Sequence, residues 1–230
     1  MQATAGHPQI LFIDGLPGSG KSTAAKAVGD RLPDCRVFAE SAPNHPLLVG
    51  TPDAMGAAFA NIQEVHSADS FANAALERLE TFFKVARCDV LYVFESHPIQ
   101  STARVLFQLD APQTAILQFW SDLQDRLAFA QPRLILFEED DPLRAFETIN
   151  RERGANWMQY VLEAFEHYPW MQARDLTGFQ GINQMILAYA DLLNRLADQW
   201  RFPMLKLPAR PDSYELREDA LTKWAMTQVT

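Results

Sequence analysis

Five short apolar runs recur along the chain, and stretches with the periodicity of helices separate them. The runs cover residues 9–13, 36–39, 89–94, 132–137 and 203–207. β-Branched and aromatic residues are frequent in them, and proline, aspartate or other polar residues bound them, which predicts β-strands. The run at 89–94 is apolar at nearly every position, as is typical of a parallel strand buried on both faces.

Apolar residues spaced three and four apart predict the helices between these strands. In residues 69–87 the spacing of Phe71, Ala75 and Leu79 predicts an amphipathic helix with Asp69 or Ser70 as its cap. An apolar stripe over residues 179–200 predicts a helix that faces the core. The remaining predicted helices cover residues 22–28, 99–109, 114–130, 142–153, 157–167 and 213–226.

Strands that alternate with helices predict an α/β fold, with a parallel sheet covered by helices on both faces. The chain has 230 residues, which predicts a single domain over 1–230. Proline and glycine recur in residues 42–69, which predicts a substrate-side insert in the form of a loop with one or two short helices. Residues 144–157 are predicted to form a lid.

Residues 15–22 match the phosphate-binding pattern G-x-x-x-x-G-K-[ST] between a predicted strand and a predicted helix, which is the context that this motif requires. Glycines let successive backbone N–H groups point into one concavity at the positive end of a helix. A lysine then reaches the β- and γ-phosphates, and a hydroxyl faces Mg²⁺. The motif predicts a nucleoside triphosphate site, with ATP and Mg²⁺ as cofactors, at Gly15, Pro17, Gly18, Ser19, Gly20, Lys21, Ser22 and Thr23.

Charge and composition restrict the partners of the protein. A net charge of −9 argues against non-specific nucleic-acid binding, which needs a basic face. Residues 1–8 lack the features of a signal peptide, and no apolar run reaches membrane-spanning length, so we expect a cytoplasmic protein without a membrane partner. Cys35 and Cys88 precede apolar runs and are expected to be small, buried and reduced. The oligomeric state stays open, with a homodimer among the alternatives.

Two carboxylates follow predicted strands, and the carboxyl ends of parallel strands carry the site in open α/β sheets. Glu40 follows the second strand and is a candidate general base for an acceptor hydroxyl. Glu95 ends the third strand and is a candidate ligand of Mg²⁺ or of its water shell. A solvated strand end is the alternative for both, and which of the two is the base stays open.

Arginines near a helix-ending glycine are candidates for a mobile lid. Arg151 and Arg153 lie just before Gly154, and Arg144 lies seven residues before Arg151 on the same helical face. Cations carried by a lid can stabilise the charge that spreads over a transferred phosphoryl group. The alternative is a solvated basic patch.

Other polar residues carry weaker signals. His45 and His97 each precede a proline, where a turn with a polar edge is the usual role. The acidic run 138–141 is interpreted as a helix N-terminus rather than a metal site. Asp14 receives no assignment.

Taken in order, the phosphate loop, Glu40, Glu95 and the arginines before Gly154 resemble the P-loop nucleoside and nucleotide kinases, closest to the thymidylate kinase and deoxyribonucleoside kinase branch. The resemblance implies the strand order 2-3-1-4-5, with an acceptor over the carboxyl edge of the sheet. It also implies that Glu40 is the catalytic carboxylate, that Glu95 is the acid of the third strand, and that Arg151 and Arg153 are lid arginines.

The chain departs from that branch directly after the third strand. Thymidylate kinases carry Asp-Arg there and deoxyribonucleoside kinases carry Glu-Arg-Ser, whereas this chain has Glu95 and Ser96 without the arginine. Pro17 and the run 95–98 resemble a bacterial group of uncharacterised kinase-like ATP-binding proteins.

The sequence therefore predicts an ATP-dependent phosphotransferase that acts on a small hydroxyl or phosphate acceptor, nucleoside- or nucleotide-like. The alternative is an ATP-hydrolysing regulatory protein without a small acceptor. A switch GTPase would carry an Asn-Lys-x-Asp element after the fourth strand, where this chain has the acidic run 138–141. A motor-type ATPase would end the third strand in Asp-Glu, where this chain has Phe94 and Glu95.

Overall fold

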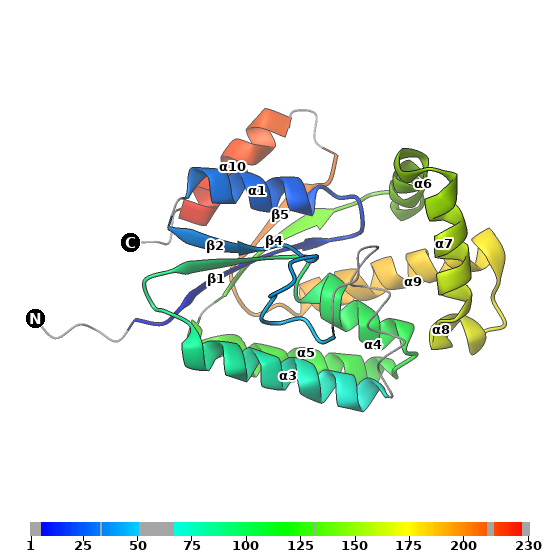
Figure 1. Cartoon of the computed structure of the whole chain (residues 1–230), viewed down its shortest axis with the longest axis horizontal. Helices are drawn as coiled ribbons and strands as arrows, with labels where there is room; N and C mark the ends of the chain where they lie inside the picture. The colour runs from blue at the N-terminus through cyan, green and yellow to red at the C-terminus, as the bar shows by residue number, and fades with distance from the viewer. Residues whose placement is uncertain (1–5, 33, 51–66, 131, 211–213, 227–230) are drawn as a thin grey trace, which may run out of the picture.

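The computed structural model describes residues 6–32, 34–50, 67–130, 132–210 and 214–226. Its centre is a five-stranded sheet in which every neighbouring pair is parallel, in the order β2-β3-β1-β4-β5 (Figure 1). The predicted fold class and strand order are therefore confirmed. The strands are β1 (Gln9–Gly15), β2 (Cys35–Phe38), β3 (Leu91–Glu95), β4 (Arg133–Glu138) and β5 (Met204–Pro208).

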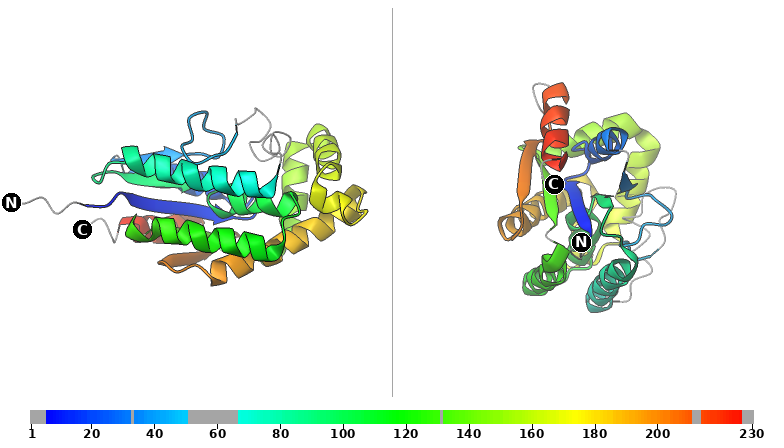
Figure 2. Two further views of the ribbon diagram at one scale, coloured as in Figure 1. Left: turned by 90° about the horizontal axis from the view of Figure 1, so that it is seen from below. Right: turned by 90° about the vertical axis from the view of Figure 1, so that its left-hand side faces the viewer.

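Helices cover both faces of the sheet. On one face, α1 (Lys21–Arg31) and α10 (Tyr214–Met226) pack over a small core that includes Leu11, Ile13 and Val28. On the other face lie α3 (Ala68–Val85), α4 (Arg104–Gln108), α5 (Gln113–Leu127) and α9 (Gly178–Asp198), as Figures 1 and 2 show. Beyond the carboxyl ends of the strands lie α6 (Pro142–Arg153), α7 (Ala155–Glu166) and α8 (Pro169–Gln172).

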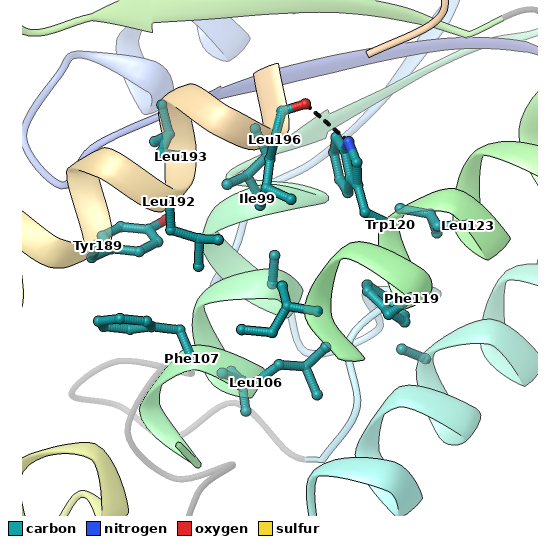
Figure 3. Close-up of a cluster of buried hydrophobic side chains, with 14 of the residues drawn as sticks. Ile99, Leu106, Phe107, Phe119, Trp120, Leu123, Tyr189, Leu192, Leu193 and Leu196 are labelled. Carbon is teal, nitrogen blue, oxygen red and sulfur yellow. Dashed lines mark hydrogen bonds between the residues drawn. The ribbon is translucent and has the colours of Figure 1, made fainter. Parts of the chain in front are cut away.

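The larger core lies between the sheet, α4, α5 and α9. In Figure 3, Trp120 of α5 points towards α9, and its indole Nε1 donates a hydrogen bond to the carbonyl of Leu196 at 2.9 Å. Most of the predicted stripe of α9 is buried there, including Tyr189, Leu193 and Leu196. Phe179 departs from the stripe, since its side chain at the start of α9 is 44% exposed.

Strand register places the site at one end of the sheet. Ile13 of β1 pairs with Glu95 of β3, and Gly15 pairs with Phe137 of β4. The turn after β1 therefore lies beside the ends of β3 and β4, so the phosphate loop and Glu95 meet at the same edge.

Several sequence expectations are corrected. The cap of α3 is Ser67, whose Oγ accepts from the backbone N–H of Ser70 at 3.1 Å, and not Asp69 or Ser70, because the helix begins one residue earlier than expected. Cys35 is half-buried because β2 is an edge strand, and Cys88 is exposed in the turn before β3. The helix α8 was not expected.

Short helices predicted between residues 42 and 69 fall largely on 51–66, which lie outside the described residues. Within the described part of the chain, no helix is both long and apolar enough to cross a membrane.

Candidate active site

The loop between β1 and α1 has the backbone shape of a phosphate cradle. Gly15, Gly18 and Gly20 have φ angles of 146°, 78° and 93°, a region that side chains with a Cβ rarely adopt. Glycine at position 18 also allows α6 to approach the loop, since a Cβ there would lie 2.7 Å from Cδ1 of Ile149 in α6. Pro17 lines the cavity beside the loop, Ser19 is buried within it, and Thr23 is exposed in the first turn of α1.

Lys21 points back over the loop that carries it. Its ammonium group donates to the carbonyl oxygens of Gly15 at 3.1 Å and Leu16 at 2.8 Å, and to Oε1 of Gln100 at 2.8 Å. Burial lowers the pKa of Lys21, while the negative charges of Asp14, Glu40 and Glu95 act in the opposite direction. These contacts hold the cation at the concave side of the loop.

Asp14, which the sequence left unassigned, is a buried connector. Its carboxylate accepts from the N–H of Gly15 at 2.8 Å, of Ile99 at 2.6 Å and of Gln100 at 3.2 Å. Burial raises the pKa of Asp14 to about 6, although Lys21 and these N–H groups lower it. The residue joins the start of the phosphate loop to the segment that follows β3.

Glu95 and Ser22, the two residues predicted to hold the metal, are in direct contact. Oε1 of Glu95 accepts from the hydroxyls of Ser22 and Ser96, each at 2.9 Å. Its Oε2 accepts from the backbone N–H of Glu40 at 2.8 Å. A hydroxyl and a carboxylate are hard oxygen ligands, and Mg²⁺ is usually held by one or two carboxylates together with substrate phosphates and waters. Ser22 and Glu95 therefore fit a magnesium site.

Glu40 reaches into the same cavity. Its Oε2 accepts from Nε2 of Gln100 at 3.2 Å, and its Oε1 lies 3.6 Å from Nη2 of Arg104. Among the described residues, Oε1 of Glu40 has no hydrogen-bond partner. Glu40 therefore keeps an oxygen available in the cavity, whereas both oxygens of Glu95 are occupied.

A single cavity of about 290 Å³ joins these groups. The phosphate loop, Glu40 and Glu95 line one part of it, and apolar side chains from α6, α7 and α9 line another. The apolar part is formed by Phe146, Ile149, Trp157, Val161, Phe165, Met185 and Ile186.

The structure separates the two predicted lid arginines. Arg153 lines the cavity, with its guanidinium 4.2 Å from the ring centroid of Trp157. Arg151 instead lines a second hollow together with Phe179 and Asn183. Arg144 is exposed near the start of α6. Arg153 thus lines the cavity that the phosphate loop also lines, and Arg151 lines a different hollow.

The histidines and the acidic run lie outside this cavity. His45 and His97 are buried with ring centroids 5.6 Å apart, and His97 Nδ1 is hydrogen-bonded to the Ser101 hydroxyl. Burial lowers the pKa of His45 to about 4. Asp141 caps α6 by accepting from the N–H of Arg144 at 3.0 Å, so the acidic run is confirmed as a helix start.

Among the cavity residues that sequence reasoning missed are the polar side chains of Gln100, Arg104, Gln108 and Tyr189. Three of them are spaced four apart, so they recur at helical spacing in a segment where apolar residues are the rule. That spacing was the signal available in the sequence.

No family model matches the chain, and no curated protein matches its sequence. Three solved structures are similar to it over nearly the whole chain. Deoxyadenosine kinase from M. mycoides, solved with bound dCTP, is 15% identical, with a TM-score of 0.48, over 96% of this chain and 98% of that chain. The YorR protein from Bacillus subtilis is 11% identical, with a TM-score of 0.49, over 94% and 96%.

The third is the tRNA isopentenylpyrophosphate transferase from Staphylococcus epidermidis, which is 12% identical, with a TM-score of 0.48, over 95% of this chain and 98% of that chain. At such identities and TM-scores, none of the three assigns an activity to this chain. Its own sheet order and its phosphate loop give it the P-loop NTPase fold.

Proposed function

We propose that the protein is a small-molecule kinase, which transfers the γ-phosphoryl group of ATP to a hydroxyl or phosphate acceptor in the cavity beside the phosphate loop. Nucleoside- and nucleotide-like acceptors come first among the candidates because of the family resemblance. The proposal treats the chain as one domain, with residues 42–69 on the acceptor side and residues 144–157 as the lid.

One observation carries the proposal: the phosphate loop opens into the cavity that also holds Glu40 and has apolar walls. A regulatory ATPase has no need for such a chamber, because its acceptor is water. Ligand sites with largely apolar walls and a few converging polar groups are typical of small-molecule binding.

Each group has a proposed role in the transfer. The acceptor oxygen forms a bond to the γ-phosphorus, the bond from that phosphorus to the β,γ-bridging oxygen breaks, and Glu40 accepts the proton of the acceptor hydroxyl. Lys21 and Arg153 stabilise the charge that spreads over the transferred group. Magnesium, held by Ser22 and Glu95 when bound, would neutralise charge on the β- and γ-phosphates.

The proposal predicts that Lys21→Ala lowers kcat about a thousandfold, because several kcal/mol of transition-state stabilisation is lost with the cation. The measurement is ADP release with Mg²⁺, ATP and a panel of hydroxyl acceptors. Lys26→Ala is the matched control, since Lys26 lies on the same helix with its side chain 75% exposed and paired with Asp30.

ADP release that is independent of every acceptor would favour the regulatory ATPase instead. Circular dichroism must show that both variants fold. A folded Lys21→Ala protein with turnover within tenfold of the wild type would contradict a catalytic role for the loop.

A further inference from the structure

The segment after β3 carries a row of buried polar side chains that the proposed transfer does not yet explain. Gln100, Arg104 and Gln108 are spaced four apart, and their exposed fractions are 5%, 7% and 1%. Residues Ile99–Ala103 form a π-helix that leads directly into α4. All three side chains line the cavity beside Glu40.

Arg104 presents an open edge in this row. Its Nε and Nη2 atoms are buried and have no hydrogen-bond partner among the described residues. Its nearest charge is the carboxylate of Glu40, with Nη2 lying 3.6 Å from Oε1. Nε and Nη2 form the edge of a guanidinium that binds the two oxygens of a carboxylate or phosphate side by side.

An arginine whose edge is buried without hydrogen bonds is unfavourable until a ligand supplies acceptor oxygens. A neutral carbonyl would provide one oxygen for two donors, whereas an oxyanion provides an oxygen for each. The buried position of Arg104 in a chamber with apolar walls therefore favours an anionic ligand.

We propose that the acceptor carries an oxyanion, a carboxylate or a phosphate-type group, next to the hydroxyl that is phosphorylated. The oxyanion accepts from Nε and Nη2 of Arg104 while the hydroxyl donates to Oε1 of Glu40. Since these two side chains are 3.6 Å apart, the hydroxyl and the oxyanion lie on the same or neighbouring carbons of the acceptor. This inference rests on the proposed function. Among the hydroxyl acceptors of that function, it favours hydroxy acids and their phosphate-type analogues over nucleosides, which carry no oxyanion beside a hydroxyl.

The rest of the acceptor is largely apolar. Val161, Phe165 and Met185 line the chamber around Arg104. The hydroxyl of Tyr189 and Oε1 of Gln108 are also buried without a hydrogen-bond partner in the described part of the chain. The Tyr189 hydroxyl can donate and Oε1 of Gln108 can accept, so together they can bind one further polar group of the acceptor.

Binding to a matched series of compounds tests the proposal without turnover. The probes are mandelate, α-hydroxybenzylphosphonate, mandelamide, 1-phenylethanol, phenylacetate and thymidine, titrated by calorimetry into the protein with Mg-ADP. We expect mandelate or the phosphonate to bind at least tenfold more tightly than mandelamide and 1-phenylethanol. Phenylacetate, which lacks the hydroxyl, should bind more weakly than mandelate. Whichever of mandelate and the phosphonate binds more tightly shows whether the acceptor carries a carboxylate or a phosphate-type group.

Variants then assign the preference to Arg104. Arg104→Gln should remove the preference for the anion over mandelamide, and Arg104→Lys should keep part of it. The control is Arg195→Gln, which removes an exposed arginine on α9 that pairs with Asp191. This control should leave the binding ratio, defined as the affinity for the anion divided by the affinity for mandelamide, unchanged.

Three results would overturn the proposal: neither anion binds, mandelamide or thymidine binds as tightly as the anions, or folded Arg104→Gln keeps the ratio. If Arg104→Gln lowers kcat but leaves the ratio unchanged, Arg104 acts only by positioning Glu40. A failed Lys21→Ala experiment would remove the phosphotransfer proposal, whereas the binding ratio reports on Arg104 alone.

Discussion

The two ends of the cavity differ in how far the protein satisfies its own polar groups. At the phosphate-loop end, Lys21 and Glu95 make three hydrogen bonds each, and Asp14 accepts from three backbone N–H groups. Oγ of Ser19 is the exception within the loop, since it is buried without a partner among the described residues. At the acceptor end, Arg104, Gln108 and Tyr189 keep buried polar atoms without a partner among the described residues.

This difference separates a site that the fold organises in advance from one that its ligand must complete. A phosphate chain is the same in every nucleoside triphosphate, so its binding groups can be fixed by the protein itself. A buried polar atom without a partner destabilises the folded state, and it is retained where a ligand supplies the partner. The acceptor end is therefore where we expect the specificity to lie.

Glu40 and Glu95 lie where these two ends of the cavity meet. Replacing each of them by glutamine tests the comparison most strongly. Glu40→Gln should lower kcat by about a hundredfold or more, because the amide cannot accept the proton, while ATP affinity stays near that of the wild type. Glu95→Gln should instead raise the Mg²⁺ concentration needed for the half-maximal rate. Magnesium titrations at saturating ATP distinguish the two effects.

The assignment is reversed if Glu40→Gln is near wild type and Glu95→Gln stays inactive at saturating Mg²⁺. The base would then belong to the phosphate-loop end.

The lid arginines sharpen the comparison, because only one of them lines the cavity. Arg153→Gln should lower kcat about tenfold, which corresponds to about 1.4 kcal/mol of lost charge stabilisation from an exposed group. Arg151→Gln, which lines the other hollow, should change kcat by no more than about twofold. The two variants are matched in charge and helix position.

Hydrogen exchange over residues 146–157 gives an independent measurement of the lid. Exchange should slow when a non-hydrolysable ATP analogue and an acceptor are both bound. If exchange slows only at the phosphate loop, residues 146–157 do not close over the ligands. If Arg153→Gln and Arg151→Gln lower kcat equally, Arg153 does not stabilise the transferred group.

The last expected effect concerns stability and not turnover: the buried histidine pair next to the third strand should make the stability of the fold depend on pH. Burial, and to a lesser degree the charge of Arg78, lowers the pKa of His45 to about 4, and the neutral His97 faces its ring. A folded-state pKa below the unfolded value of about 6.5 means that stability is present above pH 6.5 and is lost as the pH falls towards 4. The loss is up to about 3 kcal/mol for His45.

Thermal unfolding between pH 4.5 and pH 7.5 measures this dependence. His45→Asn retains an acceptor for the N–H groups of Leu47 and Leu48, so its unfolding temperature should fall less steeply with acid. Asp14 acts in the opposite direction, since its raised pKa gives stability that is lost as the pH rises through about 6. Parallel curves for wild type and variant would contradict the role of His45.

What the sequence predicts follows the same division between the two ends. The phosphate loop could be predicted because its functional residues follow one another in the sequence. The strand register then brings Glu95 to the loop, as expected for the end of a neighbouring strand. Most helix bounds follow from local periodicity, whereas the sheet order was implied by the family resemblance. Arg151 and Arg153 lie only two positions apart on α6. Which of them faces the cavity depends on tertiary packing, so the sequence could not distinguish them.

The acceptor end could not be predicted in the same way. Arg104 and Tyr189 lie on separate helices, and they line the same cavity because α4 and α9 lie on the same face of the sheet. Asp14 was left unassigned because its three partners lie in the backbone, which carries no sequence signal.

The π-helix at Ile99–Ala103 bears on how this chain can be aligned with P-loop proteins of known structure. Its hydrogen bonds span five residues, from the N–H of Ser101 to the carbonyl of Ser96 and from that of Ala103 to that of Pro98. A π-turn therefore contains one residue more than the α-helical turn that it replaces. An alignment with a relative that is α-helical here needs a one-residue gap. Without the gap, Arg104 is matched to a position about 100° around the helix and is therefore paired with the wrong residue.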